Sequence, residues 1–424
     1  MEKMIQFPLQ FGNDTQLKAI ADKYGTPLMV HDARSYHAYA KQALSVPDPF
    51  GITVRYAMKA NSNSAILHIF DELGIHIDAS SVYEVKRALA AGISPEKILL
   101  TSQQALSKVE IKDVVESGVN YCCTSLTQLQ RYCELFSQSR KSVSVRINPG
   151  LGSGHNNRTN TAGLAASFGI WHEYIPEVKH IALENGLKIN RIHTHVGSGS
   201  DWEIWKKAVS MTLEIIRHFP DATVLNLGGG YKIDRNFLER SIDLHAVFTV
   251  VKRELESFAS ETGRKLTLEI EPGTYLAANA CMLLASVNDI VDTGANGYHF
   301  LKIDASMTEL LRPMIYGAKH PIRLLNDTDR KHQDYVVVGC CCESGDIFTV
   351  CDGDPEAVAT VSLPEAHIGD VVAIMGTGAY GISMSAKNYN SRPICAEVMI
   401  WEDGTHSLIS RRQDVEEIWE REIA

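Results

Sequence analysis

Lys59 is the residue whose type and position most directly suggest chemistry, because it follows the β-prone run 54–58. An amine at the end of an apolar strand is costly to bury unless it is paired or neutralised. A desolvated lysine loses its proton more readily and can then form a Schiff base with a carbonyl compound. The alternative is that Lys59 caps the strand and reaches solvent, as most lysines do.

Three further motifs offer groups that complement an amine. The triplet Gly228-Gly229-Gly230 follows a predicted strand, and its backbone N–H groups can approach a phosphate closely, although it can also be a simple turn. Glu271 can hold a proton on a pyridine nitrogen, or else form a salt bridge or helix cap. His195 can lie flat on an aromatic ring, or else be a hydrogen-bonded histidine of the core.

The elements that must position these residues alternate along the chain. β-prone runs cover 54–58, 75–78, 98–101, 119–123, 143–148, 189–195, 223–227 and 266–271, and helical patterns between them include 64–73, 82–91, 126–136, 202–217 and 244–261. Eight strands alternating with helices predict an α/β fold, a (β/α)8 barrel of the TIM type. An open doubly wound sheet would also alternate.

Polar and reactive residues recur where the predicted strands end. These residues are Lys59, Asp78, Ser102, Thr124, Asn148, His195, the glycine triplet and Glu271. Barrel enzymes place their active sites at the carboxyl ends of the strands. We therefore expect a site at this end of the barrel.

Beyond about residue 280 the pattern changes to short alternating runs, at 282–287, 298–303, 335–338, 347–351, 371–375 and 394–401. Turn signals separate them, which predicts a second, mainly β domain of the sandwich or barrel type. A helix at 15–24 and a strand at 27–31 precede the barrel and are expected to join that domain. The predicted domains are thus a barrel at 36–280 and a β domain formed by 1–35 and 281–424. The charged tail 411–420 predicts a solvated helix.

The composition excludes several classes of protein. Of 424 residues, 51 are acidic and 41 basic, for a formal net charge of -10, which argues against a nucleic-acid surface. We expect no signal peptide and no membrane span, hence a cytoplasmic protein. The nine cysteines lack the pattern of a disulfide framework, and they also lack the spacing of a zinc site.

An amine, a phosphate-compatible turn and a carboxylate together meet the needs of pyridoxal 5'-phosphate. The chain resembles the barrel-type (fold type III) decarboxylases that use this cofactor and act on ornithine, arginine and diaminopimelate. The matching blocks occur in the order of that family, at 56–61, 195–198, 228–230, 271–273, 342–346 and 378–380.

The resemblance implies a role for each matching residue. Lys59 forms the Schiff base with the cofactor, His195 stacks on its ring and Glu271 pairs with the pyridine nitrogen. The phosphate is expected to be held by Ser198, Gly228, Gly229, Gly230, the backbone of Gly273, Thr274 and Tyr275, and Tyr380. Asp78 completes the expected cofactor-binding set.

The blocks 311–317, 378–385 and 388–393 are similar to the branch of the family that acts on diaminopimelate. That similarity implies decarboxylation of meso-2,6-diaminopimelate to L-lysine and CO2. Arg312 and Tyr316 then meet the distal carboxylate, Glu343 meets the distal amine and Tyr380 also contacts substrate. Cys342 protonates the carbon that has lost CO2. Cys342 and Glu343 are expected to enter the active site from the partner subunit of a homodimer.

Thr274 departs from the family pattern, which has arginine directly after Glu-Pro-Gly. Losing that charge-assisted contact to the distal carboxylate would cost about 1.5–3 kcal/mol of binding. Lys319 and Arg323 are candidates to replace it. Another amino acid, including a D-amino acid, or an amino-acid unit on a larger intermediate therefore stays open as substrate.

Two further readings are less consistent with the residues. A non-catalytic regulatory homologue would tend to lack the lysine or the cysteine, yet Lys59 and Cys342 are both present. A racemase shares the barrel and the lysine, but the block 342–346 argues against it.

Overall fold

The computed structural model divides the chain into two units and describes residues 12–152, 161–196, 202–236, 239–325 and 329–423. Unit 1 takes residues 1–38, 234–239 and 277–424. Unit 2 takes residues 39–233 and 240–276. The sequence predicted borders at 35/36 and 280/281, and it gave no sign that the six residues 234–239 belong with the β unit.

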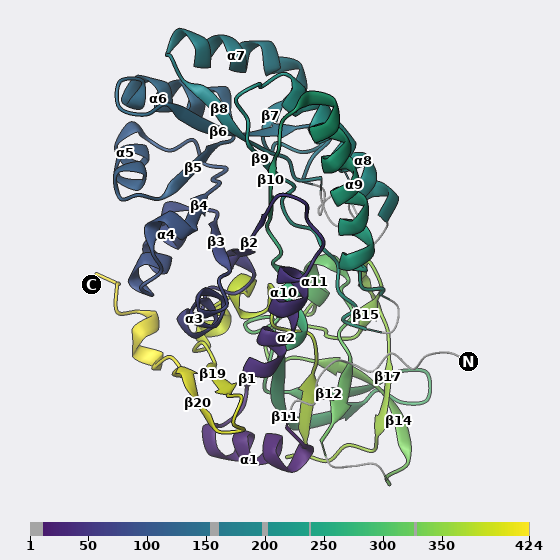
Figure 1. Cartoon of the computed structure of the whole chain (residues 1–424). Coiled ribbons are helices and arrows are strands. Elements are labelled where there is room, and N and C mark those ends of the chain that lie inside the picture. Colours follow the sequence, from purple (N-terminus) through teal and green to yellow (C-terminus); the bar gives the residue numbers. More distant parts are fainter. Residues whose placement is uncertain (1–11, 153–160, 197–201, 237–238, 326–328, 424) are drawn as a thin grey trace. The chain divides into compact units, whose positions relative to one another are not determined.

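Unit 2 contains a closed barrel of eight parallel strands (Figure 1). The strands are β2 Ile52–Ala57, β3 His76–Ala79, β4 Ile98–Leu100, β5 Asn120–Cys123, β6 Ser142–Asn148, β8 Lys188–His193, β9 Val224–Asn226 and β10 Thr267–Ile270. Each pairs with the next, and β10 pairs with β2 to close the ring. The short strand β7 Ile170–Trp171 pairs with β6. The predicted (β/α)8 fold is therefore confirmed.

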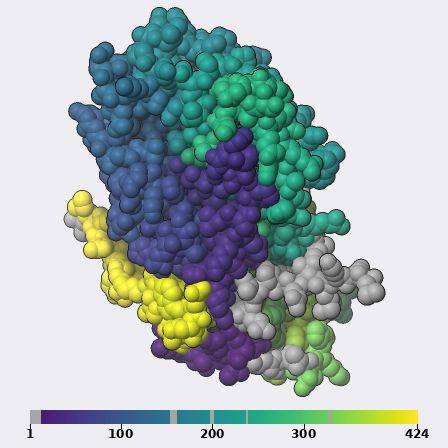
Figure 2. Space-filling model, viewed as in Figure 1, coloured from purple at the N-terminus to yellow at the C-terminus, as the bar shows by residue number. Residues whose placement is uncertain are grey.

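Amphipathic helices connect the barrel strands. They are α3 Ser64–Glu72, α4 Val82–Ala90, α5 Lys108–Glu116, α6 Leu126–Phe136, α7 Ile175–Glu184, α8 Trp202–Arg217 and α9 Leu244–Thr262. Several begin at a side chain that accepts a backbone N–H of the first turn, such as Ser107, which forms a capping box with Glu110. Helices α8 and α9 lie side by side, and their outer faces form part of the teal-to-green surface in Figure 2.

Unit 1 is built on a nine-stranded sheet that follows the order β17-β14-β12-β11-β1-β19-β20, with β18 joining β11 to β13. Its strands are β1 Leu28–Asp32, β11 Cys281–Asp292, β12 His299–Ile303, β13 Ile322–Leu324, β14 His332–Val338, β17 Val361–Pro364, β18 Val371–Ile374, β19 Ala396–Ile400 and β20 His406–Ser410. The strands β15 Val350–Cys351 and β16 Asp354–Val358 form a separate pair. The helices α1 Asp14–Tyr24 and α11 Arg312–Tyr316 belong to this unit. The helix α2 Ala33–Leu44 begins in unit 1 and continues into unit 2, whereas the short α10 Thr274–Ala277 begins in unit 2 and ends at the first residue of unit 1.

The central strands of this sheet are buried on both faces, which explains their continuous apolar runs. Met29 packs in one apolar cluster, while its neighbours Leu28 and Val30 pack in the other, together with Leu17 of α1. Successive residues of a strand point to opposite faces, so one strand feeds both cores. The predicted β domain is confirmed, and the strand expected at 27–31 joins it as β1.

The charged tail 411–420 is not a regular helix, because only the short 3-10 turn Val415–Ile418 forms there. Within the described residues, no helix combines the length and the apolar character needed to cross a membrane.

Candidate active site

Lys59 lies just beyond β2, in the 3-10 turn Met58–Ala60, at the carboxyl end of the barrel strands. Its side chain is 45% exposed, and its Nζ lies 3.9 Å from Oδ2 of Asp78, which is buried at the end of β3. From the sequence, a desolvated lysine is expected at this position. The structure instead presents the amine at the open end of the barrel, with a carboxylate as its neighbour.

Glu271 follows β10 and is buried close to that same end of the barrel. Nδ2 of Asn226, the last residue of β9, donates to its Oε1 at 2.7 Å. Burial raises the pKa of Glu271 above its usual value, while Asn226 and Lys59 act in the opposite direction. Burial likewise raises the pKa of Asp78, and the charge of Glu271 adds to the effect. Two enclosed carboxyl groups therefore face the amine of Lys59.

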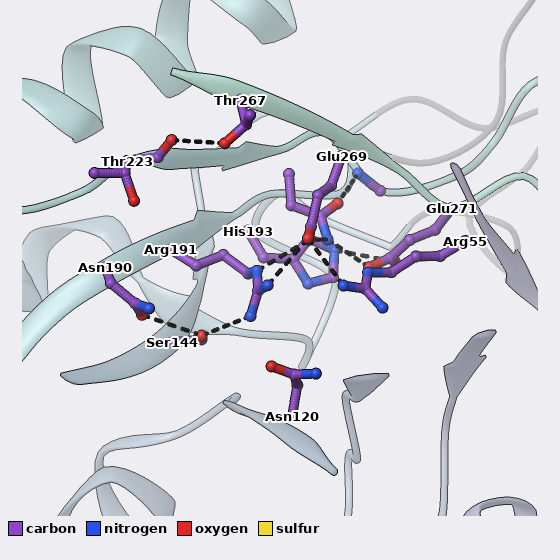
Figure 3. Close-up of polar contacts among 12 residues, drawn as sticks. Arg55, Asn120, Ser144, Asn190, Arg191, His193, Thr223, Thr267, Glu269 and Glu271 are labelled. Carbon is purple, nitrogen blue, oxygen red and sulfur yellow. Dashed lines mark hydrogen bonds and ion pairs between the residues drawn. The ribbon is translucent and has the colours of Figure 1, made fainter. Parts of the chain in front are cut away.

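A charged layer lies one step deeper in the barrel (Figure 3). Glu269 precedes Glu271 by two residues, so both point to the same side of β10. Arg55 of β2 donates to Oε1 of Glu269 at 2.9 Å, and Arg191 of β8 donates to the same atom at 3.0 Å. Asn226 donates to Oε2 at 3.2 Å and so links this layer to Glu271. Burial works against ionisation of Glu269, but the two guanidinium groups outweigh it and lower its pKa.

Two histidines stand near the same end of the barrel. His193, the last residue of β8, has Nε2 3.3 Å from Oε2 of Glu271. Burial, together with the positive charge of Arg146, lowers the pKa of His193 and His195 well below the usual value. Both imidazoles are therefore neutral at physiological pH. A neutral, partly buried His195 has a ring face suited to stacking on a planar group.

The glycine triplet is shaped by its close contacts. Gly228 has a φ of +68°, and a Cβ added there would lie 2.7 Å from Cβ of His195. A Cβ added to Gly229 would collide with the carbonyl oxygen of Glu271. Only glycine fits this turn, because both its conformation and its neighbours exclude a side chain. Gly273 approaches Ala57 and Ala60 in a similar way, at 3.3 Å from an added Cβ.

These residues of unit 2 fit pyridoxal phosphate. Lys59 offers an amine, Glu271 an enclosed carboxylate, His195 a neutral ring, and the Gly228–Gly230 turn a backbone without side chains in the way. Oδ1 of Asp78 is enclosed and has no hydrogen-bond partner among the described residues, as expected of a group that faces a ligand. Ser198 lies outside the described residues. The hydroxyl of Tyr275 donates to Gln42, and Thr274 is the first residue of α10.

Unit 1 contains the residues predicted to bind substrate, and it brings Arg312 and Tyr316 together. Arg312 begins α11, and its guanidinium carbon lies 5.7 Å from the ring centre of Tyr316. Burial, and next the charge of Arg235, lower the pKa of Arg312 to about 9. Tyr380 acts in the opposite direction and raises the pKa of this guanidinium. Its φ of +57° is unusual for a bulky side chain, and such strain persists where the surroundings hold a residue in one working position.

The three cysteines of the block 340–346 differ in exposure. The thiols of Cys340 and Cys341 donate to Asp304 and Ser306, whereas Cys342 is exposed. Asn390 accepts the backbone N–H of Cys342 at 2.7 Å. Glu343 is exposed as well. The expectation that Cys340 and Cys341 are packing residues agrees with these contacts.

Sequence reasoning overlooked the charges within the strands. Arg55, Arg191 and Glu269 each interrupt an apolar strand, and a charge at such a position is rarely buried without a partner. That pattern was a usable signal for the network. Arg235 was also overlooked. It is buried and lies in neither a helix nor a strand, so periodicity gives no signal for it.

Comparison with known proteins gives one match to the barrel region and several to almost the whole chain. Residues 32–278 match the model of the pyridoxal-dependent decarboxylase family, pyridoxal binding domain. A diaminopimelate decarboxylase of Streptomyces coelicolor is 35% identical, over 96% of this chain and 92% of that enzyme. A crystal structure of a diaminopimelate decarboxylase has a TM-score of 0.89 at 31% identity and covers 97% of this chain and 98% of its own. The Helicobacter pylori enzyme complexed with L-lysine has a TM-score of 0.84 at 28% identity, covering 95% of this chain and 98% of its own.

Proposed function

The chain belongs to the family of pyridoxal-dependent decarboxylases, and on this premise we propose that it converts meso-2,6-diaminopimelate to L-lysine and CO2. The observation that carries the proposal is the enclosed carboxylate of Glu271, held by Asn226 at the barrel end where Lys59 presents its amine. The names of relatives that match almost the whole chain support diaminopimelate as the substrate.

The residues of unit 2 hold and polarise the cofactor in this proposal. When bound, pyridoxal phosphate supplies a sink for the electron pair left as CO2 departs. Lys59 would hold the cofactor covalently through Nζ, with Asp78 beside it. Glu271 would hold a proton at the pyridine nitrogen, and Asn226 keeps the Glu271 carboxylate oriented. Neutral His195 would supply a ring face for stacking, and the turn at Gly228–Gly230 would let the phosphate approach the backbone.

The residues of unit 1 recognise the other end of the substrate. The distal end of diaminopimelate carries both a carboxylate and an ammonium group. Arg312 and Tyr316 suit the carboxylate, because a guanidinium donates two parallel hydrogen bonds to it. Glu343 suits the ammonium group. Cys342 delivers a proton to the carbon that has lost CO2.

We further propose a homodimer in which Cys342 and Glu343 serve the active site of the partner subunit. Their exposure on unit 1 supports this, since groups that act on a bound substrate cannot be sealed within their own unit. A cytoplasmic location is also proposed. All nine cysteines are free thiols, which suits a reducing compartment.

Thr274 favours one alternative, the decarboxylation of a different amino acid, because the arginine expected after Glu-Pro-Gly is absent. CO2 release from meso-diaminopimelate, L-lysine, L-ornithine, L-arginine, D-lysine and D-ornithine tests the two possibilities. We expect kcat/KM to be highest for meso-diaminopimelate, and Lys59→Ala to report the background. Preference for any other amino acid would reject the proposed substrate while leaving the decarboxylase assignment intact.

A further inference from the structure

Arg235 is a buried cation of unit 1 whose guanidinium is incompletely paired. Arg235 is 5% exposed, and a Cβ added to Gly376 would lie 3.3 Å from its Cβ and 3.4 Å from its Cγ. Among the described residues, its Nε and Nη2 have no hydrogen-bond partner. Glu239 accepts the backbone N–H of Arg235 at 2.9 Å. A buried charge normally has partners for its donors, so this guanidinium is prepared for a group that binds from outside.

Arg235 belongs to the same cluster as Arg312 and His320. Asn236 donates to the carbonyl oxygen of Lys319 at 3.0 Å, which ties the segment that carries Arg235 to the one that carries His320. Nδ1 of His320 donates at 2.8 Å to the carbonyl oxygen of Met375, the neighbour of Gly376. Its Nε2 is enclosed and, like Nε of Arg312, without a partner in the described part of the chain.

The cluster carries more positive than negative charge. Arg235 and Arg312 bring two positive charges, and the carboxylate of Glu239 acts on both and offsets one of them. Burial and the charges of Arg312 and Arg235 lower the pKa of His320 to about 3, so this imidazole adds no charge at neutral pH. One further oxyanion would balance the charges and pair the open donors.

We propose that Arg235 is a specificity-determining residue that, together with Arg312, binds the distal carboxylate of the substrate in place of the arginine that is absent at position 274. This inference rests on the proposed function, and it names the substrate class as amino acids with a second, distal carboxylate. Arg323, a candidate from the sequence, is instead paired with Asp14 at 2.7 Å.

Binding of pimelate, a dicarboxylate without amino groups, to the holoenzyme tests this assignment by calorimetry. Removing one charge-assisted contact should weaken binding about 10- to 100-fold. We expect that loss for Arg235→Met and for Arg312→Met, and no loss for the control Arg323→Met. The KM for meso-diaminopimelate should rise in Arg235→Met more than kcat falls. If Arg235→Met does not fold, Arg235→Lys keeps the charge but not the planar fork, and it should still weaken pimelate binding.

The cofactor's phosphate is the other oxyanion that Arg235 could meet, so cofactor affinity is measured alongside by titrating the apoenzyme. Unchanged pyridoxal phosphate affinity with weakened pimelate binding supports the proposal. Weakened cofactor affinity with unchanged pimelate binding overturns it, as does unchanged binding of both. If the wild type binds pimelate through Arg235 but does not decarboxylate meso-diaminopimelate, the proposed substrate fails and the carboxylate site stands.

Discussion

The residues proposed to hold the cofactor differ in their exposure at the barrel mouth. Lys59 is available because it is 45% exposed beside a carboxylate, rather than because it is desolvated. Glu271 and Asp78 show the opposite behaviour, since both are enclosed and resist ionisation. A site that contains one exposed amine and two enclosed carboxyl groups is prepared for a charged ligand, and it costs stability when that ligand is absent.

Lys59 should be the residue that carries the cofactor covalently. Borohydride reduction of the holoenzyme should fix pyridoxal phosphate to Lys59, as peptide mapping by mass spectrometry would show. Lys59→Ala should lose nearly all decarboxylation, because it removes the amine that bonds to the cofactor. Lys86→Ala, on the exposed side of α4, is the matched control and should keep full activity. Label on a different lysine would disprove the assignment.

Glu271→Gln should separate stability from activity. We expect kcat to fall about 10²- to 10³-fold, because a neutral amide polarises the bound ring less than a carboxylate does. The pKa of Glu271 is raised in the folded protein. Below its ordinary value near 4.5 the group is protonated in both states and has no effect. As the pH rises above that value, the unfolded chain releases the proton more easily, so the wild-type apoenzyme loses stability.

Thermal melts of the two apoenzymes check this trend. Glu271→Gln should be at least as stable as the wild type at pH 8, and its advantage should shrink toward pH 4.5. An amide variant that is much less stable than the wild type at pH 8 would contradict the proposed cost of the buried carboxylate.

At the scale of elements, the barrel strands place one layer of charge beneath another. Glu269 and Glu271 share one side of β10, and Asn226 of β9 bonds to both. In the Gly228–Gly230 turn that follows β9, the glycines pack against His195 and Glu271. Strand pairing therefore sets the geometry of the site more than any loop does, and a change within a strand should propagate to the cofactor.

Glu269→Gln should destabilise the barrel, because Arg55 and Arg191 would be left buried without their carboxylate. Breaking a buried ion pair from one side typically costs about 3–5 kcal/mol. Urea denaturation of the apoenzyme measures this loss. Glu261→Gln removes a carboxylate from an exposed pair with Arg217 and should leave the urea midpoint unchanged. Equal midpoints for both variants would show that the buried network contributes little.

Gly228→Ala tests the Gly228–Gly230 turn that follows β9, and Gly263→Ala at the end of α9 is its matched control. Their φ angles are +68° and +71°, so alanine costs about 1–3 kcal/mol of backbone strain at either position. An added Cβ meets His195 at position 228, whereas it meets nothing within 4 Å at position 263. Cofactor titration should therefore show an affinity at least tenfold weaker for Gly228→Ala only. Equal cofactor affinities of the two variants would show that this turn does not bind the phosphate.

At the scale of the whole molecule, the residues proposed to act on one substrate come from two units. Lys59 and Glu271 belong to unit 2, while Arg312, Cys342 and Glu343 belong to unit 1. The proposed homodimer allows Cys342 to serve the active site of a partner. That arrangement makes catalysis depend on assembly.

Mixing inactive Lys59→Ala with inactive Cys342→Ala subunits should restore activity if active sites are shared. Random exchange makes half of the dimers mixed, each with one intact site, so about a quarter of wild-type activity is expected. The double variant Lys59→Ala/Cys342→Ala mixed with Lys59→Ala is the control and should stay inactive. No recovery, despite subunit exchange confirmed by mass spectrometry, would place Cys342 in its own subunit's site or outside any site.

The barrel, the β domain and the family could all be predicted from local patterns in the sequence. Alternating periods of two and 3.6 residues reveal strands and helices locally, and the blocks around Lys59, His195, Gly228 and Glu271 are contiguous in the chain. The predicted strand ends agree with the observed ones to within about two residues. In the structure, Lys59 and His195 lie just beyond β2 and β8.

The partners of the buried charges, in contrast, are known from the folded chain alone. Arg55, Arg191 and Glu269 are separated by up to 214 residues, and no local pattern pairs them before the strands of the barrel close. Arg235 lies in a six-residue excursion that belongs to unit 1, although the chain on either side belongs to the barrel. Its burial beside Arg312 arises from contacts made across the fold, and such contacts leave no periodicity in the sequence.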